Sequence, residues 1–266
     1  MIENHVFNKK FGQNFISDKN LLAAIVKDAN ISKEDEVLEI GAGAGALTEE
    51  LAKAAKKVVS YEIDKTLTEH LREIETNHNN LTIKIEDALK AKIVDLEKDF
   101  NGDYCLVANL PYYITSPLIF KFLEETKKCK SITVMVQKEV GERFSAKPGS
   151  KNYGIPSVMI SYYCNCKITR NVSRKMFFPE PNVDSCVIRL DRKVLEEDQK
   201  FQNNFKNVVN FAFSMRRKTL ANNLTKNLKI SRDKCVEAIL KIGKTESVRA
   251  EELSLADFIN LTKQLY

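Results

Sequence analysis

The feature that most constrains the fold of this chain is a regular alternation of short apolar runs with amphipathic segments through its first 190 residues. The runs are typical of buried strands, and the segments between them carry apolar residues at helical spacing, as in Leu47 to Ala55 and Leu67 to Ile74. Because strand–helix–strand units place their strands parallel, the alternation predicts an α/β fold with a doubly wound, mostly parallel sheet. The predicted strands are Glu36–Ile40, Lys57–Tyr61, Leu81–Ile85, Tyr104–Ala108 and Ile132–Val136.

The later part of the chain departs from this alternation. Two further strand candidates, Ser157 to Cys166 and Ser185 to Leu190, follow one another without a clear helix between them. They favour an antiparallel hairpin at the sheet edge and bring the predicted strands to seven. From Glu196 the pattern is wholly helical, so we expect one domain over residues 1–190 and a small all-helical domain over residues 191–266.

The positive charge of the chain is concentrated near its end. Residues 191–266 hold 15 Lys and Arg against 10 Asp and Glu, whereas the preceding residues hold 27 against 26. This asymmetry favours a polyanionic partner for the helical domain. A lysine-rich solvated surface would give the same count, so charge alone leaves the alternative open.

Other features bear on location and cofactors. No apolar run approaches the roughly 18 residues of a membrane span, and Met1 to His5 lack the apolar region of a secretory signal. The six cysteines are scattered without a Cys-x-x-Cys pair, which is typical of reduced thiols. We therefore expect a cytoplasmic protein without membrane contact. The three histidines are not paired at ligand spacing, which argues against a zinc site.

Polar or glycine residues follow the first three predicted strands. Gly41, Gly43 and Gly45 form a G-x-G-x-G turn, which lets the backbone approach a ligand closely at the carboxyl edge of a parallel sheet. Glu62 follows the second strand, where a carboxylate can accept both hydroxyls of a ribose, and Asp87 follows the third, within reach of an adenine amino group. Each acid alone suits a solvated strand end equally well. Together they predict a pocket for an adenosyl group.

The fourth strand ends in the tetrapeptide Asn109-Leu110-Pro111-Tyr112. The amide oxygen of Asn109 and the carbonyl of Leu110, next to a proline, can each accept a hydrogen bond from an exocyclic amine. Tyr112 offers a ring on which an unstacked base can lie. An ordinary turn is the alternative, because Asn and Pro are common turn residues.

These features, in this order, resemble the S-adenosylmethionine-dependent methyltransferases, and more narrowly the small-subunit ribosomal RNA adenine N6,N6-dimethyltransferase family, the KsgA type. The resemblance runs over nearly the whole chain. It includes Lys10 to Phe15, Asn109 to Pro117, Gln137 to Arg143, Gly149 to Gly154, Phe177 to Ser185 and Phe211 to Leu220.

The resemblance implies a Rossmann-like class I methyltransferase fold and the dimethylation of two adjacent adenosines near the 3′ end of small-subunit (16S) rRNA. S-adenosylmethionine would be the cofactor, S-adenosylhomocysteine its product, and no metal would take part. Small-subunit rRNA and the immature small subunit would be the partners of a monomeric enzyme. By position, the cofactor would be contacted by Asn14, Ile16, Gly41, Gly43, Glu62, Asp87 and Asn109. The target adenine would be bound by Asn109, Leu110, Tyr112 and Phe177.

Two positions depart from the family pattern. Ile16 stands where leucine is frequent, and Tyr113 where asparagine is frequent, so that Tyr113 receives no role from the resemblance. Which of Phe177 and Phe178 faces the pocket is open at this point. Arg216-Arg217-Lys218, on a helical pattern, is the candidate RNA-binding segment.

Three alternatives stay open. A large-subunit rRNA adenine dimethyltransferase of the macrolide-resistance type has the same core chemistry. A DNA adenine methyltransferase is disfavoured by the Asn-Leu-Pro-Tyr form. The third is a ribosome-assembly factor that acts mainly by binding. A nicotinamide oxidoreductase is disfavoured because the glycine spacing is not G-x-G-x-x-G.

Overall fold

The computed structural model describes residues 15–16 and 18–266. The chain divides into two compact units. The first comprises the described residues up to Gly141 together with Lys167–Arg192, and the second comprises Glu142–Cys166 and Lys193–Tyr266. The predicted division after residue 190 lies close to Lys193, where the chain enters the second unit for the last time. Residues 142–166, which precede the predicted division, group with the C-terminal helices.

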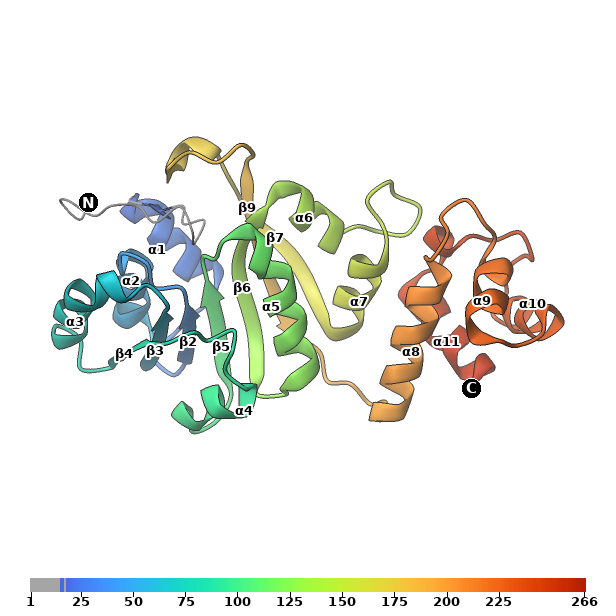
Figure 1. Cartoon of the computed structure of the whole chain (residues 1–266), viewed down its shortest axis with the longest axis horizontal. Coiled ribbons are helices and arrows are strands. Elements are labelled where there is room, and N and C mark those ends of the chain that lie inside the picture. Colours follow the sequence, from blue (N-terminus) through green and yellow to red (C-terminus); the bar gives the residue numbers. More distant parts are fainter. Residues whose placement is uncertain (1–14, 17) are drawn as a thin grey trace. The chain divides into compact units, whose positions relative to one another are not determined.

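The first unit is built on a seven-stranded sheet of order β4-β3-β2-β5-β6-β9-β7 (Figure 1). The five strands predicted first form its parallel part, and β9 runs antiparallel to β6, so the predicted α/β class is confirmed. A separate two-stranded sheet pairs β1 with β8. The strands are β1 (Phe15–Ile16), β2 (Glu36–Ile40), β3 (Lys57–Glu62), β4 (Leu81–Ile85), β5 (Tyr104–Ala108), β6 (Cys129–Gln137), β7 (Cys164–Val172), β8 (Phe177–Phe178) and β9 (Ser185–Arg192).

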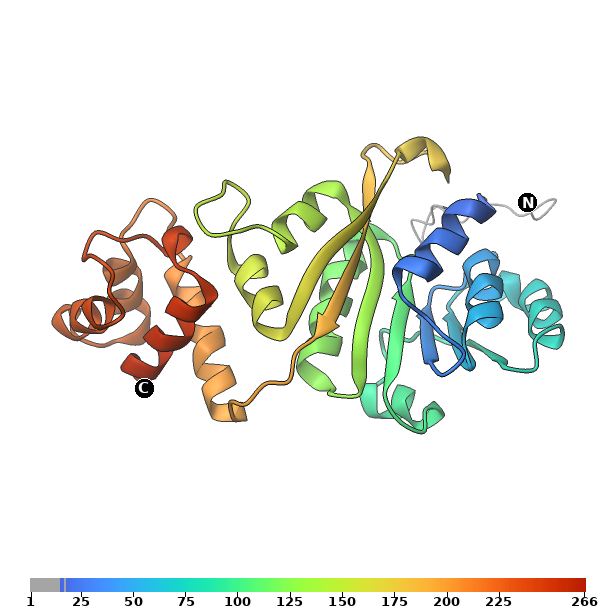
Figure 2. The ribbon, with the colours of Figure 1, turned by 180° about the vertical axis from the view of Figure 1, so that it is seen from behind.

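Helices cover both faces of this sheet (Figures 1 and 2). Alternate strand residues such as Val37, Val58 and Val107 form one core with α1, α2 and α3. On the other face α5 packs against β6 through buried residues such as Leu118 and Phe122. The helices that belong wholly or in part to this unit are α1 (Lys19–Asp28), α2 (Ala46–Ala54), α3 (Thr68–Thr76), α4 (Ile93–Leu96), α5 (Tyr112–Glu125) and α6 (Lys138–Phe144).

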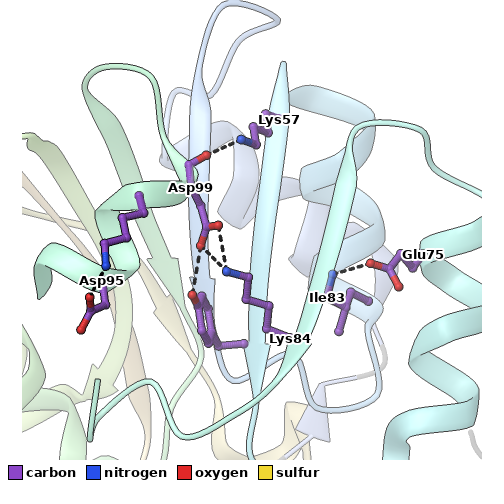
Figure 3. Close-up of polar contacts among 8 residues, drawn as sticks. Lys57, Glu75, Ile83, Lys84, Asp95 and Asp99 are labelled. Atoms are coloured by element: carbon purple, nitrogen blue, oxygen red, sulfur yellow. Dashed lines mark hydrogen bonds and ion pairs between the residues drawn. The ribbon is translucent and has the colours of Figure 1, made fainter. Parts of the chain in front are cut away.

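Asp99, in a short 3-10 turn, ties together the two strands at the open edge of the sheet. Its carboxylate accepts hydrogen bonds from Lys84 Nζ at 2.6 and 2.8 Å and from the Tyr61 hydroxyl at 3.1 Å. Figure 3 shows Asp99 between Lys84 and Lys57. The Lys57 Nζ donates to the Asp99 carbonyl. Beside them Glu75 accepts the Ile83 N–H at 2.8 Å. The network fixes β3 and β4, which lead into the site.

The predicted strand Ser157 to Cys166 is wrong over most of its length. Ile155–Tyr163 form the helix α7, and β7 begins only at Cys164. Pro156 suits the first turn of a helix, and the Ser157 hydroxyl accepts the Gly154 N–H at 3.1 Å. The segment is buried almost all round, and a short apolar run of this kind gives no periodicity that separates a strand from a helix.

The second unit is helical. Aromatic side chains form part of its core, with Tyr162 stacked on Phe205 at 4.2 Å between ring centroids and Phe213 beside Phe258 at 5.9 Å. Its helices besides α7 are α8 (Gln199–Ala212), α9 (Leu220–Leu228), α10 (Arg232–Lys241) and α11 (Leu255–Leu265). Within the described part of the chain, none of the helices has the length and apolar character that crossing a bilayer requires.

Candidate functional site

A cavity of about 420 Å³ opens at the carboxyl ends of β2, β3, β4 and β5, all within the first unit. Ligands of open α/β sheets bind at this edge. Of the residues predicted for the site, the structure brings nine together in its lining: Ile16, Gly41, Gly43, Glu62, Asp87, Asn109, Leu110, Tyr112 and Phe177. Asn14 lies outside the described residues.

The glycine turn joins β2 to α2 and packs closely on the loop after β5. The N–H groups of Gly41 and Ala42 donate to the Tyr61 carbonyl at 2.8 and 3.2 Å. Gly41 has a φ of +85°, and a Cβ placed there would lie 3.0 Å from Leu110 Cδ2. A side chain at position 41 would therefore be strained by the positive φ and would press on the Leu110 side chain.

Glu62 is buried and organises the turn. Its Oε2 accepts the Gly43 N–H at 2.7 Å, while Oε1 accepts the N–H groups of Ile63 and Asp64 at 2.9 and 2.8 Å. A carboxylate has about four acceptor positions, so capacity for a ligand hydroxyl is left. Glu62 therefore also stabilises the glycine turn, a role that the sequence did not indicate.

Asp87 begins a tight loop that crosses from β4 towards α4. Its Oδ1 accepts the Leu89 N–H at 3.1 Å, and its Oδ2 lies 3.4 Å from Lys90 Nζ. Lys121, in the middle of α5, donates to the carbonyls of Leu89 at 3.1 Å and Ala91 at 2.7 Å. The sequence analysis did not predict this role of Lys121, because no sequence pattern connects it to residues about thirty positions earlier.

Tyr112 starts α5 and lines the cavity. Its hydroxyl shares a 2.7 Å hydrogen bond with the hydroxyl of Ser185, at the start of β9. Burial raises the pKa of Tyr112, and the bond to Ser185 opposes that rise. Ser185 was also missed as a positioning residue; the one signal was its place at the end of the block Phe177 to Ser185.

The structure decides which phenylalanine faces the cavity. Phe177 pairs with Ile16 across the two-stranded sheet, and both side chains line the cavity and are buried. Phe178 is 59% exposed. Because neighbouring strand residues point to opposite sides, only one of the two can face inward.

A buried carboxyl lies behind the glycine turn. Glu39, in β2, is fully buried, and its Oε2 accepts the hydroxyls of Ser60 at 2.6 Å and Thr48 at 2.7 Å. Its Oε1 has no hydrogen-bond partner within the described structure. Burial raises the pKa of Glu39 to about 7, the two hydroxyl groups oppose the rise, and the charge of Glu62 adds to it.

This pKa makes stability depend on pH. The folded state holds the Glu39 proton more tightly than the unfolded state, whose pKa is near 4.5. The contribution is therefore full at low pH and is lost as pH rises towards 7. Relative to Glu39→Gln, we expect the wild-type free energy of unfolding to fall by about 2 to 3 kcal/mol between pH 5 and pH 8. Urea unfolding at several pH values across this range measures the free energy of unfolding of both proteins. If it changed with pH equally in wild type and in Glu39→Gln, the raised pKa of Glu39 would be refuted.

The predicted RNA-binding segment Arg216–Lys218 is exposed but is not helical, which corrects the sequence prediction. It forms the turn between α8 and α9. Buried Asn223 holds this turn by donating to the carbonyls of Ala212 at 2.7 Å and Met215 at 3.1 Å, and Thr219 caps α9. The sequence pattern did not indicate this turn, because the bonds that hold it join residues 8 to 11 positions apart.

Comparisons with known proteins agree with this geometry. A family model described as ribosomal RNA adenine dimethylase matches residues 4–265. Ribosomal RNA small subunit methyltransferase A of Clostridium botulinum (strain Okra / Type B1) is 46% identical over 263 residues, which cover 98% of this chain and 94% of the relative.

Two solved structures are also similar. A dimethyladenosine transferase from Plasmodium falciparum has a TM-score of 0.78 at 28% identity, over 93% of this chain and 95% of that one. The 23S rRNA methyltransferase ErmE has a TM-score of 0.75 at 26% identity, over 95% and 99%. Because the family model spans both units and the cavity lies where its chemistry requires one, the chain belongs to the ribosomal RNA adenine dimethylase family.

Proposed function

We propose that this protein transfers methyl groups from S-adenosylmethionine to N6 of two adjacent adenosines near the 3′ end of small-subunit (16S) rRNA, giving N6,N6-dimethyladenosine and S-adenosylhomocysteine. The observation that carries the proposal is that Asn109, Leu110 and Tyr112 share one cavity with the strand-end residues of β2, β3 and β4. A base-binding loop and an adenosyl-binding edge are thus parts of a single site. The 46% identity to a small-subunit methyltransferase supports this substrate over large-subunit rRNA.

The residues of the cavity fit the cofactor. The volume of about 420 Å³ lies in the range of small-molecule sites. Buried Glu62 would accept a ribose hydroxyl at its remaining acceptor position and Asp87 the adenine amino group, while Gly41 and Gly43 leave room for close backbone approach. S-adenosylmethionine supplies a methyl group activated by its bond to a sulfonium.

Asn109 and Leu110 would make N6 of the target adenine a better nucleophile. N6 is a poor nucleophile because its lone pair is delocalised into the ring. The Asn109 amide oxygen and the Leu110 carbonyl would accept its two hydrogens and favour a pyramidal nitrogen with a localised lone pair. Methylation makes the nitrogen acidic, so its proton leaves without a dedicated base. Positioning and electrostatics then provide most of the catalysis.

Two rings would hold the target base after it swings out of the RNA. Unstacking costs a few kcal/mol, which stacking on Tyr112 and Phe177 offsets. The bond from Tyr112 to Ser185 and the pairing of Phe177 with Ile16 fix both rings before the substrate arrives. This preorganisation reduces the free energy spent on ordering side chains.

The exposed segment Arg216–Lys218 would contact phosphates of the RNA. A second basic loop adjoins it within the same unit, since Arg216 donates to the Lys151 carbonyl at 3.5 Å, and both Lys147 and Lys151 are exposed. The partner is the immature small subunit, bound by a monomer in the cytoplasm.

The test uses S-adenosylmethionine labelled on its methyl group. Purified protein is offered small-subunit particles, large-subunit particles and naked rRNA from a strain that lacks the modification. We expect label in small-subunit RNA, recovered as N6,N6-dimethyladenosine near the 3′ end. Label in large-subunit RNA would assign the other substrate. Cofactor binding without transfer would favour a binding factor.

A prediction concerns the loop that carries Asp87. Lys121→Met removes the two bonds to Leu89 and Ala91, so the loop loses its tie to α5. We expect the Kd for S-adenosylmethionine to rise about five- to tenfold, with little change in kcat at saturation. Preference for adenine over hypoxanthine in the cofactor should weaken as well. Calorimetric titration measures both, with exposed Lys127→Met as the control. Equal affinities of Lys121→Met and wild type would contradict the role.

A further inference from the structure

Two exposed aromatic side chains stand directly beside the two rings proposed to hold the target base. Tyr113 is 69% exposed and follows Tyr112; Phe178 is 59% exposed and follows Phe177. Backbone geometry produces both pairs. Successive residues of a helix are turned by about 100°, and those of a strand by about 180°, so the second ring of each pair points in a different direction from the first.

Tyr113 differs from Phe178 in one respect. Tyr113 belongs to the lining of the cavity although it is mostly exposed, whereas Phe178 does not belong to the lining. Tyr113 therefore lies at the mouth of the cavity. Its backbone is ordered, because the Ile114 N–H and the Thr115 hydroxyl each donate to the Pro111 carbonyl at 3.1 Å. An exposed aromatic ring carried by an ordered backbone at a cavity mouth offers a stacking surface.

The substrate requires a place for a second base. This step rests on the proposed function, in which two adjacent adenosines are methylated in turn. While one base occupies the cavity, its neighbour is one phosphodiester away and has lost its stacking partner. A base in this state gains free energy from an aromatic face, and a purine, with its larger ring system, gains more than a pyrimidine.

We propose that Tyr113 stacks on the adenine adjacent to the one in the cavity, and so selects a target that has a purine neighbour. The ring acts on binding and placement of the RNA; the bonds to N6 are made by Asn109 and Leu110. Its removal therefore affects recognition of the substrate and leaves cofactor affinity unchanged.

A double-mutant cycle between protein and RNA tests the contact. Wild type and Tyr113→Ala are assayed on unmodified small-subunit particles, and on particles in which one of the two adenosines is replaced by uridine. The quantity measured is kcat/KM for methylation of the remaining adenosine. We expect each change alone to lower kcat/KM about five- to tenfold, and the two together to lower it little further.

The controls separate stacking from general damage. Tyr113→Phe should behave as wild type, because the ring is kept. Tyr266→Ala removes an aromatic side chain that is 62% exposed and lies outside the cavity lining, and it should have no effect. Independent losses that multiply in the double variant, or no loss for Tyr113→Ala, would overturn the proposal. Absence of transfer by wild type would instead overturn the proposed function, and the inference with it.

Discussion

Replacing Asn109 with alanine is expected to lower kcat for methyl transfer by about 10²- to 10³-fold, the usual cost of removing one preorganised polar group from a reacting centre. The side chain lines the cavity at the end of β5, directly before the buried Leu110. Without the amide oxygen, only the Leu110 carbonyl is left to bind the N6 hydrogens, and the lone pair stays delocalised. Single-turnover assays with labelled S-adenosylmethionine measure the loss.

A catalytic role for Asn109 requires that kcat falls while the affinity for the RNA substrate is kept. Asn210→Ala, at an exposed position of α8, removes the same amide elsewhere and should leave the rate unchanged. Small-subunit particles should bind Asn109→Ala nearly normally, because the other proposed RNA contacts, at Tyr112, Phe177 and Arg216–Lys218, are kept. A variant that kept more than about a tenth of wild-type kcat would show that Asn109 is not the principal acceptor.

The parallel part of the sheet was predictable because its strands are largely buried and are followed by polar or glycine residues. The bounds predicted for Glu36–Ile40, Leu81–Ile85 and Tyr104–Ala108 are those observed. The prediction failed for Ser157 to Tyr163 because that segment is buried almost all round in the second unit, so its pattern is that of either element. Pro156 was the local signal for a helix.

The site was predictable where it depends on strand ends. Parallel strands carry Gly41, Glu62 and Asn109 to one edge, so position in the pattern was enough. It was not predictable where a contact joins distant segments. Lys121 and Ser185 reach their partners only through the packing of α5 and the insertion of β9 beside β6.

The second large effect is expected at a glycine that touches no proposed ligand. Gly45 caps α2 with a φ of +77°, and a Cβ there would lie 2.3 Å from Ile74 Cδ1 and 3.3 Å from Leu71 Cδ2. Both neighbours belong to the buried core, so the Ile74 methyl must move within packed surroundings to admit a Cβ. Left-handed backbone costs an ordinary residue about 1–2 kcal/mol, and overpacking adds about 1–3 kcal/mol. Gly45→Ala should therefore lower the free energy of unfolding by about 2 to 4 kcal/mol, measured by urea unfolding followed by circular dichroism.

Two other glycines separate the backbone cost from the packing cost. Gly149 has a φ of +79° with no atom within 4 Å of a Cβ, so Gly149→Ala should lose only the backbone contribution, about 1–2 kcal/mol. Gly102 has neither constraint, and Gly102→Ala should change stability by no more than about 0.5 kcal/mol. If Gly45→Ala lost no more than Gly149→Ala, the contact with Ile74 would be relieved at no cost. The glycine would then be required by the turn alone, and the close packing of α3 against the start of α2 would not constrain position 45.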